Sequence, residues 1–197
     1  TNPSLMRKAG AKDYKKYSKK ILKISKKKPV SLEVFGDNYE SMKTQALKIS
    51  EWGKNVYVKI PITNSKKQFM GKLIKELNAK NIMINITAVY SSNQVRKILK
   101  FINKKTNVII SIFAGRAGDV GIDPIPEFKK SIHLSKKFKN VKILWASVRE
   151  PYNYIQAQQL GCHLITVPPG IIEKIEKFGK SFSILTNETV KGFLKDS

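Results

Sequence analysis

The chain has 197 residues, which suits one domain with a sizeable core, and its hydrophobic content of 41% excludes a disordered polymer. No stretch reaches the roughly 18 apolar residues of a membrane span, and a single cysteine, Cys162, excludes a disulfide framework or a cysteine-based zinc site. The net charge of +24 comes mostly from lysine, so we interpret it as solvated helix faces rather than as a nucleic-acid-binding surface.

Short apolar strands alternate with amphipathic helices along the chain. An N-terminal helix is predicted over 12–27, and strands are predicted over 29–35, 55–61, 81–90, 107–113, 141–147 and 163–168. Asp37 or Asn38 can cap the helix after the first strand, and Pro151 suits the first turn of a later one. Further helices are predicted over 65–79, 92–103, 126–138, 170–178 and 188–194, and a glycine-rich loop precedes 126. Strands joined by helices predict a parallel sheet.

One polar position recurs at a fixed interval. Glu33, Lys59, Asn85 and Ser111 follow one another 26 residues apart, each near the C-terminal end of a predicted strand. This interval is typical of a repeated strand–helix unit. Six predicted strands leave both a doubly wound sheet and a (β/α)8 barrel open.

Alternation with a period of two sorts each strand into two faces. One face is apolar and suited to pack under helices, and it is predicted to contain Leu32, Val34, Val58, Ile60, Ile84, Ile86, Ile110, Ile112, Leu144 and Ala146. The other face gathers polar residues toward the strand ends, namely Glu33, Lys59, Asn85, Thr87, Ser111, Ser147 and Arg149. Helices cover both faces of a doubly wound sheet, so its strands are apolar throughout. The polar face therefore favours a barrel, whose inward residues at the C-terminal rim form the active site.

Lys59, in the segment "NVYVKIP" (55–61), is the most telling of these residues. In so lysine-rich a chain, one interpretation is that its amine simply reaches water along an apolar surface. The alternative is a buried amine kept partly neutral for chemistry. Adjacent strands would put Glu33 beside Lys59, where an acid and an amine can couple their proton transfers.

Two of the four arginines follow adjacent predicted strands. Arg116 lies in "FAGRAGD" and Arg149 lies in "ASVRE". Arginine guanidinium groups, together with hydroxyls and the main-chain amides of a glycine-rich loop, are suited to bind a phosphate or carboxylate group. Taken singly, each arginine also fits a salt bridge at the rim, with Asp119 or Glu150 as its partner.

Five segments together resemble the small transaldolases and the related fructose-6-phosphate aldolases. They are "TNPS" (1–4), "VYVKIP" (56–61), "NITAVYSSNQ" (85–94), "SIFAGRAGD" (111–119) and "WASVREP" (145–151), and the match runs in order from residue 1 to about residue 178. The resemblance implies a (β/α)8 barrel of the class I aldolase type. It also implies an enzyme that uses no metal and no organic cofactor, and the single cysteine makes a reducing, cytoplasmic setting the default expectation.

The resemblance assigns a role to each matching residue. Lys59 matches the lysine that forms a Schiff base with the ketose carbonyl, and Glu33 with Thr87 matches the pair that holds a catalytic water. Asn85 and Asn2 match asparagines that orient the substrate. Residues that line the site or clamp the sugar phosphate are matched by Ser111, Phe113, Arg116, Ser147 and Arg149, with Ser4 a weaker candidate beside Asn2.

Two positions separate the branches of the family. The aldolase branch resembles this pattern with Gln in place of Glu33 and Tyr in place of Phe113. The chain therefore resembles a transaldolase, which transfers a dihydroxyacetone unit from a ketose phosphate to an aldose phosphate in the non-oxidative pentose phosphate pathway. The alternatives are a fructose-6-phosphate aldolase, a basic and catalytically incomplete fragment that binds polyanions, and a fragment completed by another chain.

Family members begin with a strand that carries an "LDT"-like aspartate, whereas this sequence begins at "TNPS". We therefore expect one barrel domain over 1–197 without its first one or two strands and without that acid/base aspartate, ending in C-terminal helices over 170–197. Sugar phosphates are the expected partners, with no membrane and no nucleic acid. The resemblance also implies a ring-like homo-oligomer in which the helix near 188–194 packs on a neighbouring copy.

Overall fold

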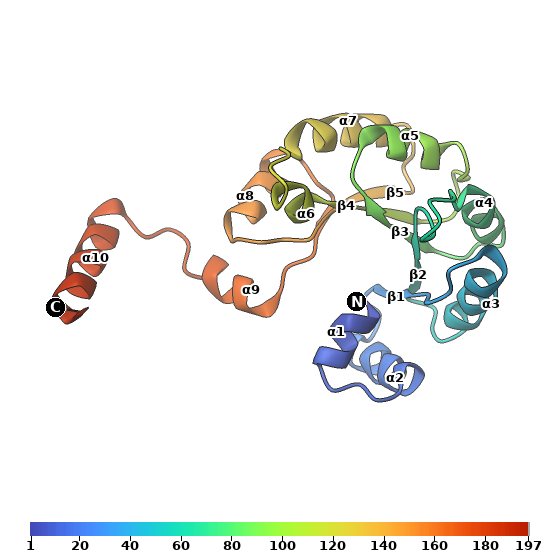
Figure 1. Cartoon of the computed structure of the whole chain (residues 1–197), viewed down its shortest axis with the longest axis horizontal. Coiled ribbons are helices and arrows are strands. Elements are labelled where there is room, and N and C mark those ends of the chain that lie inside the picture. The colour runs from blue at the N-terminus through green and yellow to red at the C-terminus, as the bar shows by residue number, and fades with distance from the viewer. Residues whose placement is uncertain (197) are drawn as a thin grey trace.

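A computed structural model describes residues 1–196, and its centre is a six-stranded parallel sheet whose strands lie side by side in chain order. The strands are β1 (Val30–Glu33), β2 (Val56–Pro61), β3 (Ile84–Val89), β4 (Val108–Phe113), β5 (Val141–Ala146) and β6 (Leu164–Ile165). The sheet curls into a partial (β/α)8 barrel, with β1 and β6 at its two edges (Figure 1). The predicted fold is confirmed.

Helices cover the convex side of the sheet (Figure 1). They are α3 (Tyr39–Ser50), α4 (Gly71–Ala79), α5 (Ser92–Leu99), α7 (Ile125–Ser135) and α8 (Tyr152–Gln159). At the N-terminus, α1 (Pro3–Lys8) and α2 (Tyr14–Ser25) lie beside β1, and the short α6 (Ala114–Gly118) follows β4. The chain ends with α9 (Pro169–Ile175) and with α10 (Phe182–Asp196), which stands away from the body.

The main core lies between the sheet and these outer helices. Strand residues such as Val58, Ile60 and Ile84 are fully buried there, and Trp145 stacks on Phe128 of α7 with ring centroids 4.5 Å apart. A second, smaller cluster lies on the concave face and contains Tyr57, Ile109, Leu144 and Ala146, with Met83, Phe113 and Leu164 packed against it.

The prediction that Leu144 and Ala146 share the outer face was wrong, because they belong to the concave cluster while Ile143 and Trp145 belong to the main core. The segment "VKILWA" that forms β5 is apolar at four successive positions. An apolar run of this kind gives no alternation from which the inward residues can be identified.

The helix predicted over 65–79 begins only at Gly71. The residues before it form a loop that is closed by an antiparallel bridge between Thr63 and Phe69. The carboxylate of Asp37 accepts hydrogen bonds from the main-chain nitrogen of Ser65, at 2.8 Å, and from its hydroxyl. Asp37 is thus committed to this loop, and Asn38 caps α3 instead.

Other bounds differ mainly at the ends. The helices predicted over 92–103 and 126–138 end earlier, the strand predicted over 163–168 contains two residues, and the helix predicted over 188–194 extends over Phe182–Asp196. Two short helices were not predicted. Asn2 caps α1, with Pro3 at its first position, and α6 occupies part of the expected glycine-rich loop.

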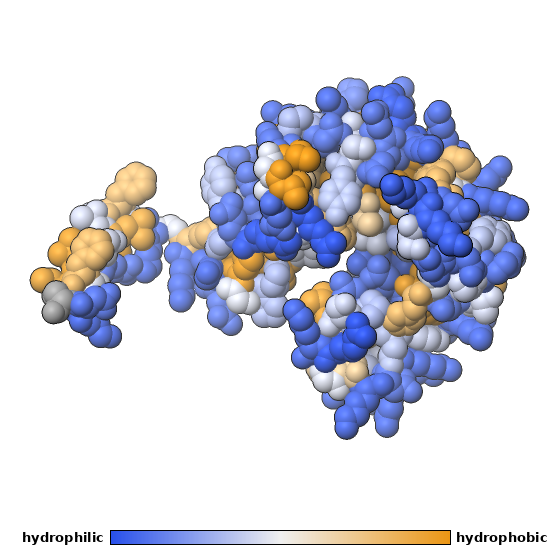
Figure 2. Space-filling model, viewed as in Figure 1, coloured by the Kyte–Doolittle hydropathy of each residue, from blue (hydrophilic) through white to orange (hydrophobic). Residues whose placement is uncertain are grey.

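Hydrophilic residues cover most of the visible surface of the body, while apolar ones gather on α10 (Figure 2). Within residues 1–196, the longest apolar helices fall short of what a membrane crossing requires.

His163 joins the last two strands. Its Nδ1 atom accepts a hydrogen bond from the main-chain nitrogen of Ile143 at 3.1 Å, and its own main-chain nitrogen donates to the carbonyl of Ile143. Burial, reinforced by the charge of Lys142, lowers the pKa of His163 from its ordinary value of 6.5. The folded state thus favours the neutral imidazole over the imidazolium. The stability that His163 contributes is therefore present above pH 6.5 and is lost as the pH falls below that value.

We therefore expect the melting temperature to fall between pH 7.5 and pH 5.5, and to fall less in a His163→Gln variant, because glutamine at this position carries no titratable group. The matched control is His133→Gln, on α7, which replaces the other histidine of the sequence in the same way. Thermal melts at the two pH values measure this difference. Equal pH dependence in both variants would show that the imidazole does not contribute.

Candidate active site

The central feature of the site is one level of three polar residues on neighbouring strands. In the parallel register Glu33 of β1 lies opposite Lys59 of β2, which lies opposite Asn85 of β3. The Nζ atom of Lys59 is 3.3 Å from the Oε2 atom of Glu33. The side chains of Lys59 and Glu33 are only 14% and 19% exposed, so the ion pair is largely shielded from water.

A chain of hydrogen bonds fixes the amide of Asn85, which is buried. The hydroxyl of Ser111 donates to the amide oxygen at 2.7 Å, and the amide nitrogen donates to the hydroxyl oxygen of Ser31 at 2.9 Å. Asn85 itself pairs with Ile109 of β4, so Ser111 reaches it from one inward position further along that strand. The amide orientation is therefore determined from both sides.

Thr87 lies two residues beyond Asn85 on β3 and is only 2% exposed. Among the described residues its hydroxyl has no hydrogen-bond partner. Immediately after it, the register with β4 shifts between Ile86 and Val89, and Ala88 adopts a left-handed φ of 58°. Such strain is uncommon for a residue with a side chain and concentrates at functional sites.

Phe113, at the end of β4, packs against the concave apolar cluster that contains Tyr57. Its ring also meets that of Tyr90, with centroids 5.8 Å apart, and the guanidinium of Arg116 lies 5.5 Å from its centre. Phe113 therefore links the concave apolar cluster to Tyr90 and Arg116.

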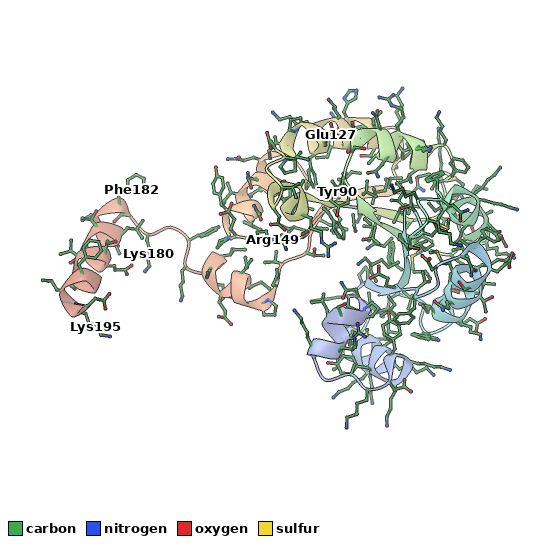
Figure 3. All side chains as sticks on the ribbon, viewed as in Figure 1. Tyr90, Glu127, Arg149, Lys180, Phe182 and Lys195 are labelled. Atoms are coloured by element: carbon green, nitrogen blue, oxygen red, sulfur yellow. The ribbon has the colours of Figure 1, made fainter. Side chains whose placement is uncertain are left out.

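The two arginines adopt different arrangements. Arg149 forms a two-pronged ion pair with Asp119, with an Nη2–Oδ2 distance of 2.6 Å, and its side chain is half exposed. This hydrogen bond lowers the pKa of Asp119 and raises that of Arg149, and the charge of Arg116 lowers the pKa of Asp119 further. Tyr90 and Arg149, both labelled in Figure 3, follow the C-terminal ends of β3 and β5. Both arginines thus act on one carboxylate.

Ser147 follows β5 with a left-handed φ of 64°. Its carbonyl oxygen approaches Gly115 so closely that a Cβ atom on Gly115 would be 1.8 Å away. The same Cβ would be 2.7 Å from the Cγ atom of Arg149. The loop that carries Ser147 and Arg149 can therefore lie against α6 only because residue 115 has no side chain.

The side chain of Asn2 takes part in a helix cap. Its side-chain oxygen accepts a hydrogen bond from the main-chain nitrogen of Leu5 at 2.8 Å and so caps α1. The segment is nevertheless close to the site, since the nitrogen of Thr1 donates to the carbonyl of Ser31 at 2.9 Å. The contacts of Asn2 support a structural role, and its contact with substrate stays a prediction.

The arrangement offers an amine beside a carboxylate, a fixed amide, a buried hydroxyl and two guanidinium groups, all at the C-terminal end of a parallel sheet. Such a set can form an imine, transfer protons and bind an anionic group. Within residues 1–196 no three His, Cys, Asp or Glu side chains gather as metal ligands would.

Sequence reasoning missed Ser31 and Tyr90 and treated Asp119 only as one possible salt-bridge partner. Ser31 precedes Glu33 by two residues and so shares its face, a signal that the strand pattern contained. Tyr90 is the last residue of the strand predicted over 81–90, but β3 ends at Val89. Beyond that end, the alternation of side chains along a strand no longer indicates which way Tyr90 points. Figure 3 also labels Glu127 of α7, which accepts a hydrogen bond from the main chain of Ser92 and so holds the start of α5.

The chain is similar to known proteins over nearly its whole length. The model of the transaldolase/fructose-6-phosphate aldolase family matches residues 1–196. A probable transaldolase of Nitrosopumilus maritimus is 33% identical over 200 residues, covering 100% of this chain and 82% of that protein. Probable transaldolases of Thermoplasma volcanium and Caldicellulosiruptor saccharolyticus are 34% and 31% identical, and the match covers all of this chain and 83% and 84% of theirs.

The contact at Gly115 gives a test of the site's construction. Gly115→Ala should lower the free energy of unfolding by about 1–3 kcal/mol, because the added methyl group forces the Ser147 carbonyl away. Gly118→Ala, in the same short helix, is the matched control, since a Cβ there meets nothing within 4 Å. Urea unfolding of the two variants makes the comparison. Equal stability would mean that the close approach imposes no constraint.

Proposed function

The chain belongs to the transaldolase/fructose-6-phosphate aldolase family, and we propose that it is a transaldolase that moves a dihydroxyacetone unit between sugar phosphates through a Schiff base on Lys59. The observation that carries this proposal is the shielded pair of Lys59 and Glu33, 3.3 Å apart at the C-terminal end of a parallel sheet. A carboxylate at that distance can accept the proton that the amine must lose before it attacks a carbonyl.

The first half of the reaction forms and uses the imine. The neutral Nζ atom adds to the ketose carbonyl, and the resulting carbinolamine loses water to give a protonated imine. Removal of the proton from the C4 hydroxyl breaks the C3–C4 bond, releases an aldose phosphate and leaves the electron pair in an enamine. Glu33 and the unpartnered hydroxyl of Thr87 are suited to relay these protons through a water molecule.

The second half reverses these steps on the acceptor. The enamine carbon attacks the aldehyde of an incoming aldose phosphate, and hydrolysis of the new imine frees the product ketose and the amine. Asn85 is suited to bind substrate hydroxyls, because Ser31 and Ser111 hold its amide in one orientation. Ser111 would line the same part of the site.

The phosphate group is assigned to Arg116 and Arg149, with Ser147 beside them. Arg149 is engaged by Asp119, so an incoming phosphate has to compete with that carboxylate for the guanidinium. Since both oxygens of Asp119 already accept from Arg149, the geometry for a two-pronged contact exists before the substrate arrives. Arg116 stays over Phe113 as the second cation.

Cleavage of fructose 6-phosphate without transfer is the second candidate activity. Transaldolase is favoured because Glu33 and Phe113 occupy the positions where the aldolase branch has Gln and Tyr. The phenyl ring of Phe113 brings no hydroxyl to the site and instead packs on apolar neighbours. We place the transfer reaction in the non-oxidative pentose phosphate pathway of the cytoplasm.

We also propose that α10 packs on a second copy of the chain in a ring-like homo-oligomer. Phe182 and Phe193 of this helix are 88% and 68% exposed, and the helix stands away from the body (Figure 1). Large exposed aromatic side chains on a protruding helix are typical of an interface.

Borohydride trapping tests the Schiff base. After incubation with fructose 6-phosphate and reduction, intact mass should increase by one reduced sugar-derived adduct, and Lys59→Met should abolish the increase. Lys142→Met is the matched control, because Lys142 is also a strand lysine but lies exposed at the opposite end of its strand. The ratio of transferred to freely released three-carbon product then separates a transaldolase from an aldolase.

A parallel sample extends the chain at its N-terminus with the first strand of a related transaldolase, including the "LDT" aspartate. An adduct in either protein that depends on Lys59 supports the proposal. Absence of an adduct from both proteins would contradict it.

Light scattering after gel filtration tests the oligomer. The parent chain should elute as a multiple of its 22.4 kDa mass, and Phe182→Ser with Phe193→Ser should shift it toward the monomer. An exposed residue of the body, Tyr152, provides the control as Tyr152→Ser. A monomeric parent protein would refute this part of the proposal.

A further inference from the structure

Tyr14, in the first turn of α2, closes the edge of the sheet at Glu33. Its hydroxyl oxygen accepts a hydrogen bond from the main-chain nitrogen of Glu33 at 2.8 Å, and the hydroxyl is 3.1 Å from the carbonyl oxygen of the same residue, to which it donates. One side chain therefore engages both main-chain polar groups of Glu33, as a neighbouring strand would.

The other edge of β1 explains why this contact matters. There Val34 donates its main-chain hydrogen to the carbonyl of Lys59 at 3.1 Å, and Glu33 pairs in register with Lys59. Since the main-chain groups of successive strand residues face opposite edges, those of Glu33 face away from β2. Tyr14 therefore provides the hydrogen-bond partners for the main-chain nitrogen and carbonyl of Glu33, which β2 cannot reach.

Tyr14 is itself held firmly. Its ring lies edge-on to Phe35 with centroids 4.4 Å apart, and the ring of Trp52 lies at 6.0 Å. Asp13 caps α2 by accepting from the main chain of Lys16 at 2.7 Å, which fixes the turn that carries Tyr14. Burial raises the pKa of the phenol to about 12, so its hydroxyl remains a donor at neutral pH.

We propose that Tyr14 is a positioning residue that sets the distance between the carboxylate of Glu33 and the amine of Lys59 by clamping the main chain of Glu33. The inference rests on the proposed function, in which these two groups exchange protons. Tyr14 belongs to the N-terminal helices, which place no other side chain at the pair of Glu33 and Lys59. The proposal therefore gives these helices a direct part in aligning the pair.

The first experiment does not depend on activity. Hydrogen exchange of individual main-chain amides, followed by NMR, compares the parent chain with Tyr14→Phe, which removes the hydroxyl and keeps the ring. The Glu33 amide should exchange about tenfold faster or more, whereas the Val34 amide, bonded to β2, should change little. Tyr17→Phe is the control, because the Tyr17 hydroxyl on the same helix donates to the carbonyl of Ala9, at 3.3 Å. Unchanged exchange at Glu33 would overturn the proposal.

The second experiment measures transfer in the N-terminally extended or parent protein, whichever forms the trapped adduct. Tyr14→Phe should lower kcat about tenfold with little change in KM, because the loss concerns the alignment of reacting groups rather than substrate binding. Tyr17→Phe should match the parent protein. A parent-like kcat in Tyr14→Phe, or a loss confined to KM, would overturn the positioning role.

The two failures can be told apart. If neither protein forms an adduct, the proposed function fails, while the exchange experiment still decides whether Tyr14 holds Glu33. If the adduct forms and Glu33 exchanges faster without any change in kcat, Tyr14 clamps the strand but does not serve the reaction.

Discussion

The parallel register of β1, β2 and β3 is the constraint on which the rest of the site depends. It places Glu33, Lys59 and Asn85 at one level without any gap or bulge between them, so three residues far apart in sequence become neighbours. A slip of one residue in any pairing would turn a polar side chain toward the outer helices. Burial of Val58, Ile60 and Ile84 on that outer side opposes such a slip, because it would exchange apolar residues for charged ones in the core.

On the concave face Lys59 and Asn85 are held by polar partners, whereas the hydroxyl of Thr87 has none among the described residues. Lys59 is neutralised by Glu33, and Asn85 is held between Ser31 and Ser111. Removing a single partner would leave a shielded charge or amide without compensation, which costs more than the contact itself contributes. The partnered polar residues of this face therefore have to satisfy one another for the fold to be stable, and the proposed chemistry uses the same residues. A substitution that changes one of these properties also changes the other.

Much of this was predictable from the sequence. The 26-residue interval indicated a repeated strand–helix unit, and the polar strand ends favoured a barrel with Glu33 beside Lys59. Prediction failed where direction comes from tertiary contacts. The run of four apolar residues in β5 concealed which side Leu144 faces, and the loop before Gly71 is non-helical because Asp37 binds Ser65. From the sequence, Tyr14 was predicted only to lie in a helix. The role of its hydroxyl depends on a hydrogen bond with the main chain of Glu33, 19 residues away.

The order of the strands also has a kinetic consequence. Every strand pairs with the one that precedes it in the chain, so each new pairing closes a loop of similar and modest length. Parallel sheets usually fold slowly because their contacts are distant in sequence. Here one strand and its helix can add to a growing sheet at a nearly constant entropic cost, much as repeats add to a solenoid. Such a chain can assemble progressively as it leaves the ribosome, without waiting for its far end.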